Sequence, residues 1–136
     1  MKLEYEVHKD DFARAGEASS KIKSILKQLG IPTQVVRKIA IATYEAEINV
    51  VIHSLGGRII ASVESDRIEI QVKDDGPGIE NIDDAMTEGW STANNAAREL
   101  GFGAGMGLPN MKRCCDEFYI ESEPGKYTHL RMIMNL

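Results

Sequence analysis

Three polar side chains stand four residues apart in the stretch YEAEINVVIH: Glu45, Asn49 and His53. On an α-helix this spacing places them in one stripe along an otherwise apolar surface. The carboxamide oxygen of Asn49 can bind Mg²⁺, and the carboxylate of Glu45 can accept a proton from an attacking hydroxyl. A solvated helix face that includes Glu47 explains the same spacing, and for this stretch alone it is the favoured interpretation.

A second polar group follows a predicted strand in VKDDGPGIENI. At the end of that strand, Asp74 can accept a hydrogen bond from the amino group of a purine. Gly76 and Gly78 would then allow the backbone to approach the flat base. An ordinary turn at the end of a strand is the alternative, because Asp, Gly and Pro all favour turns.

The third stretch, GFGAGMGLPN, has glycine at four alternate positions from 101 to 107. Bare backbone N–H groups just before a helix can bind a phosphate, because the helix N-terminus adds its dipole. A flexible surface loop accounts less well for strict alternation beside a helix. Neither G-x-G-x-x-G nor G-x-x-x-x-G-K-[ST] matches the chain in any register, which excludes Rossmann and P-loop nucleotide sites.

The elements that must position these residues follow from periodicity and from helix and turn signals. Strands are predicted over 3–7, 58–64, 67–73, 118–121 and 128–134. Helices are predicted from an N-cap at Asp10 or Asp11 to Gly30, from Pro32 until Gly56 and Gly57, over 82–88, and over 108–116, with a long loop over 89–107. This order predicts an α/β fold: a two-layer α/β sandwich with a mixed, mostly antiparallel sheet and helices on one face.

Composition limits the class of protein. The 136 residues suit one domain, 1–136, and 16 Lys and Arg against 21 Asp and Glu give a net charge of −5, which argues against nucleic acid or an anionic membrane as partner. No stretch approaches the roughly 20 apolar residues of a membrane span. Cys114 and Cys115 are adjacent and so form a poor disulfide framework, which suits the cytoplasm, where we expect them to pack against the sheet.

Taken in order, the three stretches resemble the N box, the DxGxG box and the GxGxG box of the GHKL ATPases, whose Bergerat ATP-binding fold this resemblance implies. The segments EGWSTANN, GAGMGLPNMKRCCDEFYIES and PGKYTHLRMIM are similar to the anti-sigma-factor serine/threonine kinases, and above all to the switch-kinase type. The resemblance covers nearly the whole chain. It implies an Mg²⁺- and ATP-dependent kinase that phosphorylates a STAS-domain partner.

The same resemblance implies a role for each matching residue. Glu45 would be the catalytic base and Asn49 the Mg²⁺ ligand, while Asp74 would bind the adenine amino group. The remaining cofactor-binding residues would be Gly76 and Gly78 beside the base, Gly103, Gly105, Gly107 and Leu108 on the phosphate side, and Thr128 in the final strand.

Two alternatives stay open. An ATP-gated binding module that captures a sigma factor or a STAS-domain protein, with little phosphoryl transfer, would use the same pocket. A detached catalytic domain of a histidine kinase is less favoured, because EGWST and CCDEF resemble the anti-sigma type. A homodimer is compatible with either.

Overall fold

A computed structural model describes residues 1–76, 86 and 107–136. Five strands form one sheet in the order β1-β2-β3-β5-β4, and every neighbouring pair is antiparallel. The strands are β1 (Lys2–Val7), β2 (Gly57–Val63), β3 (Arg67–Asp75), β4 (Glu117–Glu123) and β5 (Tyr127–Asn135). The α-helices in the described residues are α1 (Glu17–Gln28), α2 (Thr33–His53) and α5 (Gly107–Cys114).

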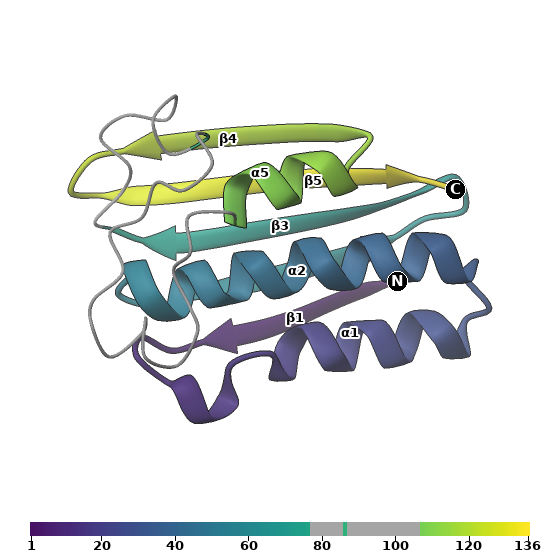
Figure 1. Cartoon of the computed structure of the whole chain (residues 1–136), viewed down its shortest axis with the longest axis horizontal. Helices are drawn as coiled ribbons and strands as arrows, with labels where there is room; N and C mark the ends of the chain where they lie inside the picture. Colours follow the sequence, from purple (N-terminus) through teal and green to yellow (C-terminus); the bar gives the residue numbers. More distant parts are fainter. Residues whose placement is uncertain (77–85, 87–106) are drawn as a thin grey trace.

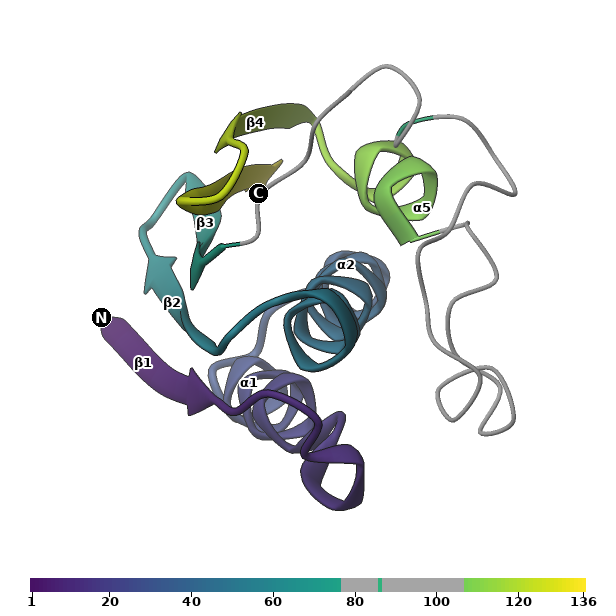
Figure 2. The same cartoon turned by 90° about the vertical axis from the view of Figure 1, so that its left-hand side faces the viewer.

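All three helices cover the same face of the sheet, with α2 between α1 and α5 (Figure 1; Figure 2). This arrangement confirms the predicted two-layer α/β sandwich. It follows from the alternation of the strands, since residues two apart point to the same side of a sheet. In β3 the buried positions are Ile68, Ile70 and Val72, and the residues between them are exposed or half-buried.

The core lies between the helices and this face of the sheet. Side chains from α1 and α2 meet side chains from the central strands there, all with at most 1% exposure: Ile22, Leu26, Ile39, Ile59, Ile70 and Met132. Their burial holds α2 against the sheet, because each large apolar side chain removed from water contributes roughly 1.5–3 kcal/mol to folding.

The opposite face of the sheet carries polar and charged side chains. Arg131 on β5 forms an ion pair with Glu69 on β3 and lies 5.4 Å from the ring centre of Tyr119 on β4. Arg58 on β2 pairs with Glu4 on β1 at 3.3 Å. The Arg58–Glu4 pair is exposed and stabilises the fold only slightly, whereas the side chain of Glu69 is only 12% accessible. Most of the buried apolar side chains of the strands lie on the helix-facing side.

The start of the first helix differs from the prediction. Neither Asp10 nor Asp11 caps α1: Asp11 precedes a short 3₁₀ helix, η1 (Phe12–Arg14), and makes no side-chain cap hydrogen bond. The chain then turns at Gly16, which has a left-handed φ of +92°, and α1 begins at Glu17. The prediction was wrong because a residue distant in sequence, described below, replaces the local cap.

The other boundaries shift by a few residues. Helix α1 ends before Gly30 as predicted, and Gly30 has a φ of +76°. Pro32 is the N-cap of α2 rather than part of its first turn, and α2 ends at His53, before the two glycines expected to stop it. Strand β3 continues to Asp75, which places Asp74 within the sheet. The helix predicted over 82–88 and the loop predicted over 89–107 lie outside the described residues, except for Met86 and Gly107.

Candidate functional site

Asp74 lies near the end of β3, which is flanked in the sheet by β2 and β5. Its register partners are Gly57 on β2 and Thr128 on β5. Two residues after Val72, it points to the helix-covered face, where the backbone N–H of Thr128 donates a hydrogen bond of 3.0 Å to its Oδ1. Within the described residues, Oδ2 accepts no hydrogen bond. A half-buried carboxylate with one free oxygen can receive a ligand N–H.

The environment of Asp74 disfavours its charge. Burial raises the pKa of its carboxyl from 3.8 to about 6, the hydrogen bond from Thr128 opposes this rise, and the charge of Asp75 adds to it. A strongly perturbed acid away from any ion pair is typical of a functional position.

Thr128 is itself buried and held by β4. Its Oγ1 lies 3.0 Å from the Oγ of Ser122, which also donates to the carbonyl oxygen of Tyr127 at 2.9 Å. The neighbouring Tyr127 points to the opposite, open face of the sheet, where its hydroxyl donates to Glu121 at 2.7 Å. Thr128 therefore shares the helix-covered face with Asp74, whereas the ring of Tyr127 does not.

Glycines surround the end of β3. Gly76 has a φ of +44°, a conformation that favours glycine. Its carbonyl oxygen and that of Asp75 accept hydrogen bonds from the N–H of Leu55, at 3.1 and 3.2 Å, and the N–H of Asp75 donates to Gly56 at 3.1 Å. These bonds tie the segment after α2 to the end of β3. Figure 1 shows both ends on the same side of the molecule.

Helix α2 carries Glu45 and Asn49 one turn apart, and both are half-buried. Burial raises the pKa of Cys114 on α5. The charge of Lys38 opposes this rise, and the charge of Glu45 adds to it. Glu45 therefore lies on the side of α2 that faces α5. The structure places Asn49 on that side as well, since four positions turn a helix by only about 40° beyond a full turn.

Glu47 lies on the other side of α2. Its carboxylate is 2% exposed and accepts hydrogen bonds from the N–H groups of Ala18 and Ser19, at 3.1 and 2.9 Å. These groups belong to the first turn of α1, which has no local side-chain cap. The interpretation of Glu47 as part of a solvated helix face is therefore wrong: this carboxylate caps α1.

The remaining predicted site residues are described only in part. Gly107 is the first residue of α5, and Leu108 follows it with 8% exposure. The first turn of α5 points toward the end of the molecule where α2 and β3 finish (Figure 1). Gly78, Gly103 and Gly105 lie outside the described residues.

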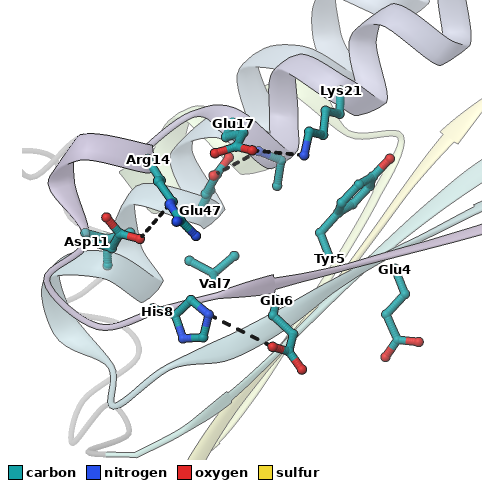
Figure 3. Close-up of a pocket in the computed structure, with 12 residues that line it drawn as sticks. Glu4, Tyr5, Glu6, Val7, His8, Asp11, Arg14, Glu17, Lys21 and Glu47 are labelled. Carbon is teal, nitrogen blue, oxygen red and sulfur yellow. Dashed lines mark hydrogen bonds and ion pairs between the residues drawn. The ribbon is translucent and has the colours of Figure 1, made fainter.

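A pocket of about 320 Å³ lies elsewhere, between β1 and the segment from η1 to α1 (Figure 3). Four of its charged residues form two ion pairs: Lys21 with Glu17 at 2.9 Å, and Arg14 with Asp11 at 3.8 Å. Glu47 also lines it, bound to the α1 backbone. Of the predicted nucleotide-binding residues that the structure describes, none lines this pocket, so it is separate from the site at Asp74.

The donor set at the end of β3 and on α2 fits a nucleotide with Mg²⁺. Within residues 1–76 and 107–136, no three His, Cys, Asp or Glu side chains form a metal-binding group. Mg²⁺ commonly takes only one or two protein ligands and completes its coordination with phosphate oxygens and water, so a single ligand such as Asn49 is compatible with it. The base of a nucleotide could be bound by the free carboxylate oxygen of Asp74, which lies beside Gly57, a residue without a side chain.

None of the helices in the described part of the chain is long and apolar enough to cross a membrane. Cys114 and Cys115 are both free thiols, and the Sγ of Cys115 donates to the carbonyl oxygen of Met111 at 2.9 Å.

The sequence of the chain is similar to those of several known proteins. Residues 9–134 match the histidine kinase-like ATPase domain. The chain is 32% identical over 115 residues to the serine/threonine-protein kinase RsbT of Bacillus subtilis, covering 82% of this chain and 80% of that one. It is 33% identical over 120 residues to the anti-sigma F factor of Thermoanaerobacter sp., covering 85% and 80%.

A solved structure shares the fold. A chain in the crystal structure of the SiaB–SiaC complex from Pseudomonas aeruginosa matches with a TM-score of 0.62 and 13% identity, covering 97% of this chain and 88% of that chain. Together with the domain match over residues 9–134, these relatives show that the chain belongs to the histidine kinase-like, or GHKL, ATPases, in the group of anti-sigma factors and their related serine/threonine kinases.

Proposed function

We propose that this chain is a single-domain, ATP-dependent protein serine/threonine kinase of the anti-sigma regulatory type. The observation that carries the proposal is Asp74, a half-buried carboxylate that one backbone N–H holds in place and that has a free oxygen beside a bare position of the sheet. A site with this free acceptor oxygen suits an amino-substituted purine, because an N–H donor of the base would satisfy it.

In this proposal, Asp74 accepts a hydrogen bond from the amino group of adenine. Thr128 holds the carboxylate from β5 and lines the same face, while Gly76 and Gly78 allow the base to lie close to the backbone. On the phosphate side, Gly103, Gly105 and Gly107 would expose backbone N–H groups, and the first turn of α5, which begins at Gly107 and includes Leu108, would add its dipole. The roles proposed for Gly78, Gly103 and Gly105 rest on the sequence alone.

Glu45 and Asn49 would perform the chemistry from α2. Glu45 would orient the acceptor hydroxyl and take its proton, which its half-buried position facing α5 permits. Asn49, one turn further along, would offer its carboxamide oxygen to Mg²⁺. When bound, Mg²⁺ supplies neutralising charge to the phosphates. The contribution of the protein is then mainly the positioning of these groups.

We propose a STAS-domain antagonist as the protein that is phosphorylated, or a sigma factor as the protein that is bound, and we place both in the cytoplasm. The names of the relatives support a regulatory protein partner of this kind, because they include an anti-sigma F factor and a serine/threonine-protein kinase. The acidic balance of the chain supports a protein partner rather than nucleic acid.

An ATP-gated binding module is the second candidate. The observation that favours it is that several relatives are named as anti-sigma factors and not as kinases. In this case ATP would control the capture of the partner, and Glu45 would have little effect on the outcome.

Glu45→Gln separates the two candidates. The full chain is incubated with γ-labelled ATP, Mg²⁺ and a STAS-domain protein, and both label transfer and ATP affinity are measured. For a kinase we expect transfer to fall by about 10²- to 10⁴-fold with ATP affinity nearly unchanged, since only the proton acceptor is lost. Glu64→Gln is the matched control, because Glu64 is an exposed carboxylate at the turn between β2 and β3.

Equal transfer by the Glu45→Gln variant, with partner release unchanged, would favour the binding module over the kinase. If the wild-type chain binds no ATP in the presence of Mg²⁺, both candidates fail.

A further inference from the structure

Gly57 stands directly opposite Asp74 in the sheet, at a place where β2 and β3 come unusually close. A Cβ at Gly57 would lie 2.5 Å from the carbonyl oxygen of Lys73 and 3.0 Å from both the Cα and the Cβ of Asp74. In ordinary antiparallel pairs, the two Cβ atoms are about 4.5–5.5 Å apart. No side chain larger than hydrogen fits between these strands without moving the backbone that carries Asp74.

The requirement for glycine here is one of space and not of backbone conformation. Gly16, Gly30, Gly56, Gly76 and Gly125 have positive φ angles, whereas Gly57 does not belong to that set. Alanine could therefore adopt the backbone angles of Gly57, and its cost would arise from the contact with Lys73 and Asp74.

Hydrogen bonds on both sides hold the strands at this short distance. The N–H of Asp75 donates to Gly56, and the N–H of Leu55 donates to Asp75. On the other side, Thr128 donates to the carboxylate of Asp74 at 3.0 Å. A methyl group at residue 57 would push Asp74 away from β2 and toward β5, so the carboxylate would lose its present position relative to Thr128.

We propose that Gly57 is a positioning residue for Asp74 and thereby sets the preference of the site for purines that carry a 6-amino group. This inference rests on the proposed nucleotide site and adds a residue to it. Gly57 contributes no atom to the base in this account; it fixes where the free oxygen of Asp74 lies.

The test compares two nucleotides, ATP and purine riboside triphosphate, which lacks the 6-amino group. Their affinities for the full chain are measured with Mg²⁺ by titration calorimetry. We expect the wild-type chain to favour ATP by about tenfold or more, because a hydrogen bond to a charged group would be lost with the analogue. Asp74→Asn should reduce this preference.

Gly57→Ala is the informative variant. We expect its affinity for ATP to fall by about tenfold while its affinity for the analogue changes by less than about threefold, so that the preference nearly disappears. Gly30→Ala is the matched control: Gly30 has a φ of +76° and no atom within 4 Å of an added Cβ, so alanine there strains the chain without touching Asp74. That variant should be less stable but keep the wild-type preference.

The outcomes separate this inference from the proposed function. If the wild-type chain binds both nucleotides equally, the adenine-binding role of Asp74 fails, and this inference fails with it. If Asp74→Asn removes the preference but Gly57→Ala retains it, Gly57 is not a positioning residue and the proposed function stands.

A second measurement distinguishes a loss of nucleotide preference in the Gly57→Ala variant from a loss of folding. All variants are also titrated in 1 M trimethylamine N-oxide, which favours folded chains. A variant that stays unfolded there would make Gly57 a requirement of the fold itself, which also overturns the proposal.

Discussion

Asp74→Asn is expected to stabilise the nucleotide-free protein at pH 7, although it should weaken ATP binding. Asparagine keeps an oxygen that can accept the N–H of Thr128, and it removes a carboxylate whose ionised form is disfavoured by burial. The rise of the pKa from 3.8 to about 6 corresponds to about 3 kcal/mol at about 1.4 kcal/mol per pKa unit. Asp74 retains some contact with solvent, so we expect a net stabilisation of about 1–2 kcal/mol.

The stability advantage of Asp74→Asn should depend on pH. Because the pKa of Asp74 is higher in the folded chain than in the unfolded chain, the unfolded state releases the proton first as the pH rises. The cost of the charged carboxylate is therefore fully present above about pH 6 and absent below about pH 4. The advantage of Asp74→Asn should shrink across this window and nearly disappear at pH 4.

Urea unfolding of the wild-type chain and the variant at pH 7 and pH 4 measures this difference. Asp66→Asn is the control, because Asp66 is exposed in the turn between β2 and β3, at the other end of β3 from Asp74, and its replacement should change the free energy of unfolding by less than about 0.5 kcal/mol. A variant that is less stable than the wild type at pH 7, or one whose advantage is the same at both pH values, would refute the reasoning.

Three further predictions concern other residues of the fold. Glu47→Gln should lower the free energy of unfolding by about 2 kcal/mol in urea titrations, because one of the two N–H groups of α1 would then face an amide donor; a loss below about 0.5 kcal/mol would contradict the capping role. Burial raises the pKa of Cys115 to about 12, so mass spectrometry should find it unmodified by iodoacetamide at pH 8 in the native chain, with the urea-unfolded chain as control; rapid native labelling would be the contrary result. Arg131→Ala should change stability by less than about 1 kcal/mol despite the ion pair with Glu69, since Arg131 is about half exposed and Glu69 keeps its hydrogen bond from Gln71. A larger loss in thermal unfolding would show that this pair is more than a surface interaction.

The strands of the sheet could be predicted because strand periodicity is local. The strand predicted over 128–134 lies within β5, which buries Leu130, Met132 and Met134 on the helix-covered face. The position of Asp74 at the end of a strand also followed from local sequence. Its distance from Thr128, 54 residues away, did not, because only the pairing of β3 with β5 brings the two together.

The start of α1 could not be predicted from its neighbours. Asp10 and Asp11 are residue types that favour an N-cap, so local propensity placed the helix too early. The actual cap is Glu47, 28 and 29 residues away from the N–H groups it accepts. Gly57 was overlooked for the same reason, since its importance lies in a contact with the neighbouring strand that the sequence around it does not reveal.

Helix α2 connects these observations. The carboxylate of Glu47 joins its middle to the start of α1, and the N–H of Leu55 joins the segment after it to the end of β3. These two contacts lie at different positions along α2 and involve different elements, α1 and β3. Together they fix the rotation of the helix about its axis as well as its position along the sheet. Glu45 stands two positions before Glu47, a rotation of about 200°, so the contact that turns Glu47 toward α1 also turns Glu45 toward α5. The sequence reveals the polar stripe of Glu45 and Asn49, but its direction depends on a buried residue on the opposite side of the same helix.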